Sequence, residues 1–246
     1  MMKNQVEMGK NRTGIALSPV DSQLLIEGAE ETLPTTEGDE SAISKARTAY
    51  AADGVPIGTM PPPVTVKGVA SGVIKAAKGK NANVFLDKLG ERLAFERTGS
   101  RLYGALLSKF DASDPLPGGP ARADLEQIQD QEAAHFAMLQ EVMMAVGGDP
   151  TAITPSADVA AVNSMGLLQV LGDPRMNMEQ SLEAILVAEL VDNDGWEMLI
   201  ALARTEGDES IVRRFEKALA EEQQHLSNVR RWLRAATLRN SGTAAS

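Results

Sequence analysis

Apolar residues recur every three or four positions along four long stretches of the chain. This period places them on one side of a helix, so it predicts four amphipathic α-helices that pack their apolar sides together. The stretches cover residues 82–110, 121–146, 178–205 and 209–236. Since no stretch of comparable length shows the alternation typical of strands, the pattern indicates an all-α bundle.

The connections between the four stretches constrain the topology. Prolines and glycines end the first helix before residue 121, and Gly207-Asp208 makes a short turn between the third and fourth. The second connection, from Gly147 to Asn177, is long and has weak helical character over 156–171. Because it can travel the full height of a bundle, helices 2 and 3 could be parallel neighbours joined by a crossover.

The segment before the first helix differs in composition. Residues 1–80 are rich in Gly, Pro, Thr and Ser and have too few large apolar residues to form a core. We expect a largely irregular extension, disordered or wrapped around the bundle, with short helices near 41–52 and 69–78. The predicted organisation is this extension, a four-helix bundle over 81–238, and a frayed tail over 239–246, with fraying expected to begin after the fourth helix.

Composition narrows the function classes. A formal net charge of −10 argues against a general nucleic-acid binder, which needs a basic face. The chain has no cysteine, which excludes disulfides, thiolate zinc sites and a rubredoxin-type centre. The first twenty residues lack the apolar core of a signal peptide, and no apolar run is long enough to cross a bilayer. The expected location is therefore cytoplasmic, without a membrane partner.

Polar residues interrupt each apolar stripe near its midpoint. Every stripe carries a glutamate there, and both histidines of the chain follow such a glutamate by three positions. Residues at i and i+3 share a helix face, so each pair can direct a carboxylate and an imidazole at one point. Buried unpaired carboxylates are costly, and two divalent cations would offset four of them. The predicted ligands are Glu96, Glu132, His135, Glu189, Glu222 and His225.

The order Glu, Glu-x-x-His, crossover, Glu, Glu-x-x-His resembles the dimetal-carboxylate superfamily of ferritin, rubrerythrin and the bacterial dimetal oxidases. The resemblance covers residues 82–236 and implies a ferritin-like four-helix bundle. It further implies that Glu132 and Glu222 bridge two metals. His135 and Glu96 would then serve one metal, and His225 and Glu189 the other.

Other polar and aromatic positions lie near the expected ligands. Asp192 occupies the position that histidine takes on the second and fourth helices, so it could be an extra ligand or an acceptor for a histidine N–H. The acceptor role is favoured over the ligand role, and a solvated or interface role stays open. Tyr103 and Trp196 each lie seven residues beyond an expected ligand. They could relay an electron or line a pocket, although core packing is favoured for both. Tyr103 is expected to lie next to the ligands without binding a metal itself. Glu221 lies off the stripe and is expected to be solvated.

Oxygen ligands with some imidazole suit iron or manganese, so the expected cofactor is two Fe or Mn ions, without haem, Fe–S cluster or nucleotide. The favoured function is a non-haem dimetal oxidoreductase acting on dioxygen or peroxide, such as a ferroxidase or oxidase. A Mn catalase stays open, whereas a self-contained rubrerythrin peroxidase lacks its cysteines. An unknown reductant and a homo-oligomer formed through bundle faces are compatible partners. The alternative is a non-catalytic metal-binding or structural module whose N-terminal tail engages a partner.

Overall fold

The computed structural model describes residues 23–24, 26–28, 31, 40–54 and 82–242. The chain divides into two compact units, Met1–Pro56 and Ile57–Ser246, and each is described by itself. In the first unit, α2 spans Glu40–Asp53, where a short helix was expected near 41–52. The second short helix, expected at 69–78, lies outside the described residues, as does most of the expected irregular extension.

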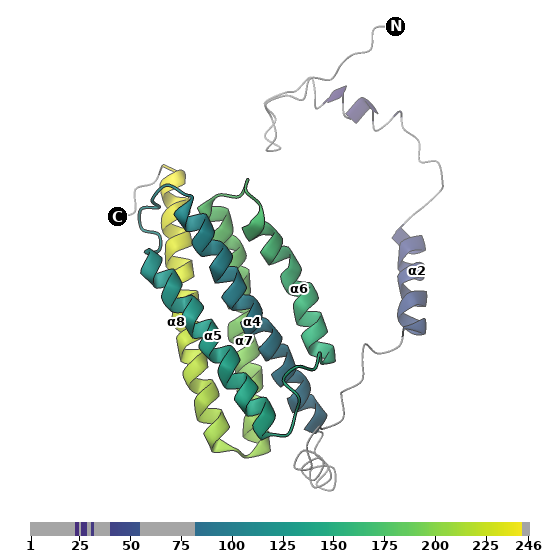
Figure 1. Cartoon of the computed structure of the whole chain (residues 1–246). Coiled ribbons are helices and arrows are strands. Elements are labelled where there is room, and N and C mark those ends of the chain that lie inside the picture. The colour runs from purple at the N-terminus through teal and green to yellow at the C-terminus, as the bar shows by residue number, and fades with distance from the viewer. Residues whose placement is uncertain (1–22, 25, 29–30, 32–39, 55–81, 243–246) are drawn as a thin grey trace. The chain divides into compact units, whose positions relative to one another are not determined.

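The second unit contains the four predicted long helices (Figure 1). They are α4 (Ala82–Asp111), α5 (Arg122–Ala145), α7 (Met178–Glu206) and α8 (Glu209–Asn240). No strand occurs among the described residues. The prediction of an all-α four-helix bundle is therefore confirmed.

The short turn between α7 and α8 is fixed by local chemistry. Gly207 ends α7 with a φ of 80°, a left-handed conformation that glycine adopts without a Cβ penalty. The Asp208 carboxylate then accepts hydrogen bonds from the backbone N–H groups of Ser210 and Ile211, at 3.0 and 3.2 Å. These bonds satisfy amides at the start of α8, so the chain reverses within two residues.

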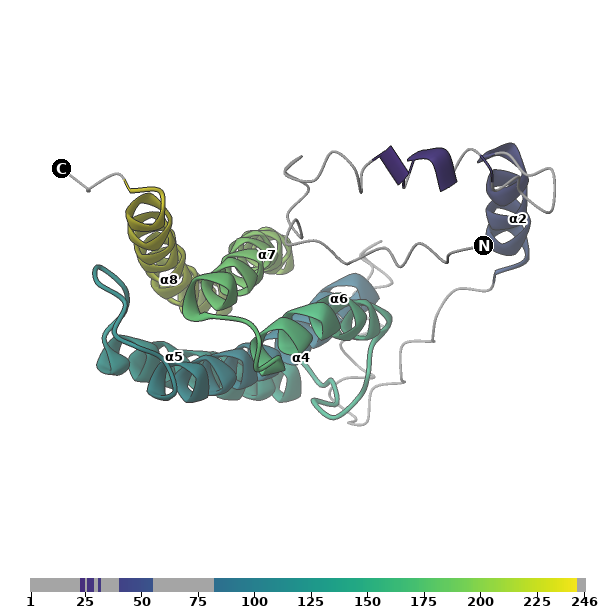
Figure 2. The same ribbon diagram turned by 90° about the horizontal axis from the view of Figure 1, so that it is seen from above.

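The long connection is more helical than the sequence indicated. It forms α6 (Pro155–Gly172), which begins with Thr154 accepting a hydrogen bond from the amide of Ala157. Figure 2 shows α6 beside α4, and α6 also touches α7. A Cβ on Gly90 of α4 would lie 2.5 Å from the Thr154 hydroxyl, so this glycine permits the close approach of the α6 start.

The second and third predicted helices, α5 and α7, are parallel but not neighbours. The expectation that they would be parallel neighbours is therefore corrected. In Figure 1, α5 and α7 run in the same direction, and no close approach joins them within the described residues. The neighbouring pairs are α4 with α5, α4 with α7, α7 with α8 and, more sparsely, α5 with α8. Because α6 packs on α4 and α7, the crossover sets α7 beside α4 and leaves α5 on the diagonal.

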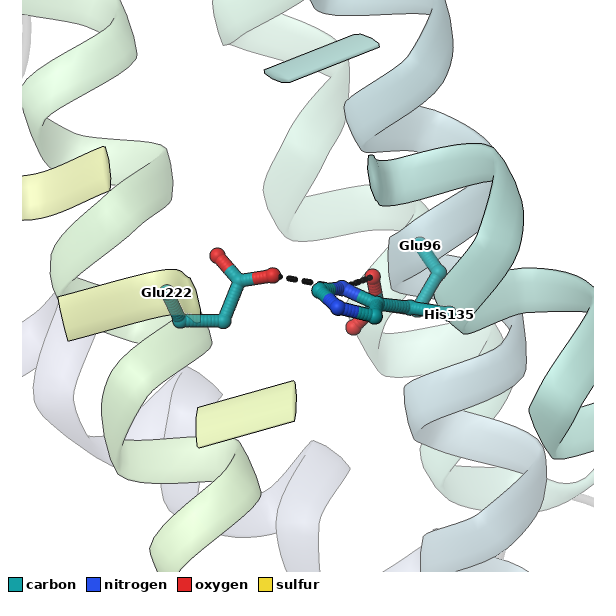
Figure 3. A group of neighbouring side chains, drawn as sticks. All are labelled: Glu96, His135 and Glu222. Carbon is teal, nitrogen blue, oxygen red and sulfur yellow. Dashed lines mark ion pairs between the residues drawn. The ribbon is translucent and has the colours of Figure 1, made fainter. Parts of the chain in front are cut away.

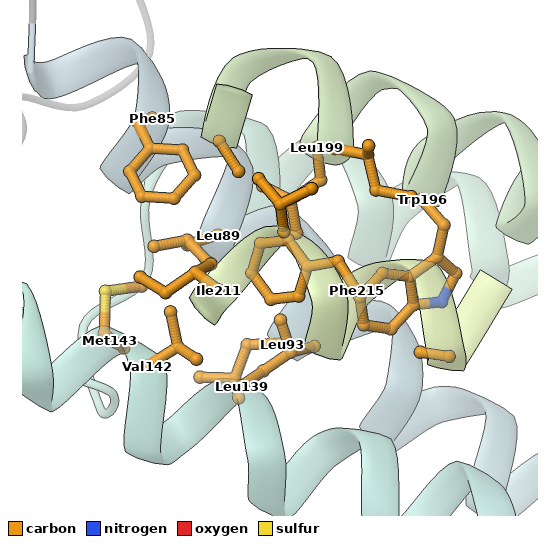
Figure 4. Packing of buried hydrophobic residues seen from close by; sticks show 14 residues of the cluster. Phe85, Leu89, Leu93, Leu139, Val142, Met143, Trp196, Leu199, Ile211 and Phe215 are labelled. Carbon is orange, nitrogen blue, oxygen red and sulfur yellow. The ribbon is translucent and has the colours of Figure 1, made fainter. Parts of the chain in front are cut away.

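The apolar core lies in two clusters separated by a polar layer. The first is built around Leu89, Leu139, Trp196 and Phe215 (Figure 4), and the second contains Leu106, Leu125, Leu182 and Trp232. On α5, α7 and α8 the predicted carboxylates fall between the residues of one cluster and those of the other, and on α4 Glu96 directly follows Phe95, the first residue of the second cluster. The two clusters therefore isolate the middle of the bundle from its ends.

The end of α8 corrects another expectation. The helix continues through Thr237 to Asn240, where fraying was predicted. Both side chains donate hydrogen bonds to the Glu179 carboxylate at the start of α7, which ties the last turn to the bundle. None of the described helices combines the length and apolar character needed to cross a membrane.

Candidate metal centre

All the expected ligands, with Asp192 and Tyr103, meet in the polar layer of the bundle. Each is at most 4% exposed. Each of the long helices contributes two of them: Glu96 and Tyr103 on α4, Glu132 and His135 on α5, Glu189 and Asp192 on α7, Glu222 and His225 on α8. The sequence pattern therefore located the buried polar layer correctly.

Glu222 lies between the two imidazoles. Its Oε1 is 2.7 Å from His135 Nδ1, and its Oε2 is 3.0 Å from His225 Nδ1. On the α4 side, Glu96 Oε2 lies 3.5 Å from the same His135 nitrogen, so the imidazole stands between two carboxylates (Figure 3). Glu132 Oε1 lies 3.6 Å from His225 Nδ1. Glu222 thus faces both histidines, and Glu132 faces His225.

Three groups of ligand atoms lie close enough to share a cation, each within 4.8 Å of one another. They are Glu96–His135–Glu222, Glu132–Glu222–His225 and Glu96–Glu132–Asp192–Glu222. Among the described residues, Glu189 belongs to none of these groups. Its Oε1 instead accepts a short hydrogen bond from the Tyr103 hydroxyl. The structure therefore does not bring Glu189 to His225 as closely as it brings Glu132.

The electrostatics of the layer oppose ionised carboxylates. Burial raises the pKa values of Glu132, Glu189 and Glu222 well above their ordinary range, and repulsion from neighbouring carboxylates adds to the shift. In the described part of the chain, several buried oxygens of the expected ligands accept no hydrogen bond: both Glu96 oxygens, Glu132 Oε2 and Glu189 Oε2. Glu222 Oε1 and His135 Nδ1 face each other at 2.7 Å. Such a set of unpartnered oxygens with an imidazole nitrogen fits divalent cations.

A glycine makes room for one of these carboxylates. Gly99 lies on α4 one turn after Glu96, and a Cβ there would stand 2.0 Å from Glu132 Oε2. Glycine in a helix interior costs stability relative to alanine. Its presence opposite Glu132 therefore serves the placement of that carboxylate and not the helix.

Sequence reasoning missed Arg92, a guanidinium buried within the layer. It lies on α4 with 3% exposure, and its Nη2 forms an ion pair with Asp192 Oδ1 at 2.7 Å. Its Nη1 donates to the Asp192 carbonyl, and its Nε lies 3.4 Å from Glu96 Oε1. Its position four residues before Glu96, on the same helix face, was the signal that could have revealed it.

The surroundings of Arg92 are shaped to hold it. The guanidinium stacks over the Phe95 ring at 4.4 Å, and a Cβ on Gly195 would lie 1.9 Å from its Nη1. Burial raises the pKa of Asp192, and Arg92 opposes this shift, leaving the value at about 6. The Asp192 carboxylate pairs with Arg92 through Oδ1, and its expected role as an acceptor for a histidine N–H stays a prediction. Its other expected role, as an extra ligand, is compatible with its membership of the third group.

The outer nitrogens of the histidines contact residues that the sequence did not single out. His135 Nε2 lies 2.8 Å from Glu221 Oε2, and His225 Nε2 lies 2.9 Å from Gln131 Oε1. Glu221 is therefore not simply solvated, although its side chain stays 27% exposed. A signal was present in the sequence, since Gln131 directly precedes Glu132 and Glu221 directly precedes Glu222.

The two histidines have different electrostatic surroundings. Burial disfavours a charged imidazole at both, but at His135 the carboxylates of Glu96 and Glu221 outweigh burial and raise the pKa. At His225 burial dominates and lowers the pKa to about 4. The neutral His225 imidazole can act as a metal ligand without first losing a proton near neutral pH.

A polar pocket opens between α5 and α8 beside His225. It has a volume of about 260 Å³. His225, Gln131 and Glu221 form part of its wall. It lies where α5 and α8 approach each other at few points, whereas α4 and α7 are covered by α6. The layer is thus approachable from the α5–α8 side.

Trp196 is a packing residue in the first apolar cluster. It is fully buried, and its ring meets the edge of His135 at 5.6 Å between centroids and that of Phe215 at 5.5 Å. This agrees with the packing role favoured for it from the sequence. Its proximity to His135 also makes it a spectroscopic reporter of that ligand.

Comparison with known proteins gives one match. Residues 121–238 match the profile of a protein family described as "Ferritin-like domain". The match covers α5 to α8 and leaves out α4, which contributes Glu96 and Arg92. No curated protein and no solved structure matches the chain.

Proposed function

The chain carries a ferritin-like domain, and on that premise we propose that it is a redox-active dimetal protein that binds two Fe or Mn ions and acts on dioxygen or peroxide. Reduced ions bound by this ligand set would supply the electrons for the reduction of such an oxidant. The protein holds the ions, orients their ligands and keeps bulk water away from them.

The charge of the polar layer is the observation that carries this proposal. Five buried carboxylates face one buried guanidinium among the described residues, which leaves four negative charges when all are ionised. Two divalent cations would balance that charge, and Arg92 accounts for the fifth carboxylate through Asp192. An isolated buried carboxylate costs several kcal/mol, so a layer of them without cations would oppose folding.

The ligand assignment follows the contacts. Glu222 faces both histidines and suits a bridging role, with Glu132 as the second bridge. Glu96 and His135 would hold one ion. His225 would hold the other, and Glu189, whose Oε1 accepts from Tyr103, is assigned to the same ion by the resemblance.

Two residues and the apolar clusters have distinct parts in this function. The Tyr103 hydroxyl stays protonated and donates a hydrogen bond to Glu189 Oε1, which fixes the orientation of that carboxylate. Burial together with the charge of Glu189 raises the pKa of Tyr103, so the phenol stays protonated. The two apolar clusters flank the layer and limit the entry of water from the bundle ends.

Metal analysis and anaerobic loading test the proposal. Protein purified without added metal is expected to contain about two Fe or Mn ions per chain, as a bundle with this ligand set holds. Loading the metal-free protein with Fe(II) and then admitting oxygen should give rapid oxidation with a visible chromophore. Stable metal without turnover would instead favour a non-catalytic metal-binding module, and full metal content in Glu132→Ala or His225→Ala would overturn the ligand assignment.

A further inference from the structure

The α5 and α8 motifs exchange contacts across the bundle. On each helix the Glu-x-x-His pair is preceded by one further polar residue, Gln131 on α5 and Glu221 on α8. Each of these contacts the outer nitrogen of the histidine on the opposite helix, Glu221 to His135 and Gln131 to His225. The two contacts therefore correspond, and they differ in the accepting group, which is a carboxylate at His135 and an amide at His225.

That difference changes the basicity of the two imidazoles. Glu221 offers a carboxylate, which accepts the Nε2–H of His135 in a charge-assisted hydrogen bond, whereas Gln131 offers a neutral amide oxygen to His225. A carboxylate behind a metal-binding imidazole fixes the ring and raises its strength as a ligand. Lys217 lies 3.3 Å from the other Glu221 oxygen and helps to keep the carboxylate ionised. His135 is therefore the stronger donor of the pair.

The pocket adds a second difference. Its wall includes His225 and the Gln131 that contacts it, whereas His135 lies behind Glu221 and against Trp196. An ion held by His225 therefore lies nearer to the opening between α5 and α8. Exchange with solvent should be easier there than beside His135.

We infer that the two metal positions are unequal: the one beside His135 fills first and holds its ion tightly, and the one beside His225 fills second and exchanges through the α5–α8 pocket. The inference rests on the proposed dimetal function. Glu221 and Gln131 are positioning residues in this scheme, since each acts through the histidine that it contacts.

Stepwise titration of the metal-free full chain with Co(II) tests this. Two binding constants are measured by calorimetry or chelator competition, and we expect them to differ by at least about tenfold. This is the lower end of the effect that a hydrogen-bond partner of a metal-binding histidine has on metal affinity. Trp196 fluorescence reports the first step, because the indole packs on His135. Quenching of Trp196 fluorescence by Co(II) should be largely complete after one equivalent. The Trp196→Phe variant should lose this quenching, which assigns the signal to Trp196.

Reciprocal substitutions make the test specific. Glu221→Gln should weaken the first step by roughly 10–100-fold and bring the constants together, while Gln131→Glu should tighten the second. The double exchange should reverse the filling order and move Trp196 quenching to the second equivalent. Glu216→Gln removes an exposed carboxylate from α8 and should leave the ratio unchanged.

The outcomes separate this inference from the proposed function. A parent protein that binds two Co(II) ions with equal constants would overturn the inference alone. The same holds if Glu221→Gln and Gln131→Glu both leave the ratio unchanged. A parent protein that binds no Co(II) would overturn the dimetal proposal and the inference together.

Discussion

The two sides of the polar layer are built differently although the same ligand pattern runs through both. On the α4–α7 side, Arg92 pairs with Asp192 and Tyr103 donates to Glu189, so these two acidic groups have fixed partners, and α6 covers these helices. On the α5–α8 side stand both histidines, next to a pocket. One side pairs most of its charge, and the other carries both imidazoles of the proposed metal centre.

This contrast shows how a bundle can hold a dense acidic layer and still admit a ligand. Neutralisation by Arg92 needs burial, since a guanidinium exposed to water would interact only weakly with Asp192. Entry needs a seam that packs loosely, and α5 with α8 provides it. Charge neutralisation by Arg92 and the proposed entry of a cation fall on opposite sides of the bundle, because one pair of helices cannot be both tightly covered and open.

The largest expected effect is on the open side. Glu222→Gln keeps the side-chain volume but removes the charge that faces both histidines. We expect the affinity for both metals to fall by more than about a hundredfold. This exceeds the effect typical of mutating a residue that only hydrogen-bonds to a metal ligand. Elemental analysis after dialysis measures this. Glu183→Gln, an exposed change on α7, should keep the metal content of the parent.

On the closed side, Arg92→Met should lower the free energy of unfolding of the metal-free protein by about 3–5 kcal/mol, because it leaves Asp192 buried without its partner. The double variant Arg92→Met with Asp192→Asn removes both charges and should recover most of that loss. Urea unfolding measures both, and Arg97→Met, on the exposed face of α4, is the matched control. Equal stability of Arg92→Met and the control would show that the ion pair contributes nothing.

The acidic layer should make the metal-free protein less stable as pH rises. Asp192 has a pKa raised to about 6 in the folded state from 3.8, so its protonated form is favoured by folding. Its contribution is fully present below pH 3.8 and lost as pH rises through about 6. The loss is on the order of 2–3 kcal/mol, and Glu132, Glu189 and Glu222, whose pKa values are also raised, extend it to higher pH.

Thermal unfolding at a series of pH values, with and without metal, measures this trend. The metal-loaded protein should show the opposite slope, because cations bind the deprotonated carboxylates. Asp192→Asn should flatten the curve of the metal-free protein between pH 4 and 6. A metal-free protein that gains stability steadily from pH 4 to pH 7 would contradict the electrostatics of the layer.

The smallest expected effect concerns the junction of the two sides. Gly99→Ala would place a methyl group against Glu132 Oε2 and displace that carboxylate. Metal affinity should therefore fall by about tenfold, the lower end of the effect of losing a residue that positions a metal ligand. The same change should favour the α4 helix by up to about 1 kcal/mol. Gly166→Ala on α6 meets nothing within 4 Å and should give the helix gain alone. A Gly99→Ala protein with unchanged metal affinity would mean that Glu132 can move freely.

The sequence by itself determined the helices and the level of the polar layer. A period of three to four residues is a local property, so the four long helices were found to within a few residues at each end. The i, i+3 spacing likewise fixed both Glu-x-x-His pairs on buried faces. The match to a ferritin-like domain agrees with the family that these motifs resembled.

Only the tertiary structure decided which residues beside the ligands take part. Arg92, Gln131 and Glu221 each lie near an expected ligand in sequence, but their partners Asp192, His225 and His135 lie on other helices. Such contacts depend on which helices are neighbours and how each is rotated, and a periodic pattern contains neither quantity. For the same reason the diagonal placement of α5 and α7 followed from the packing of α6 and not from the length of the connection.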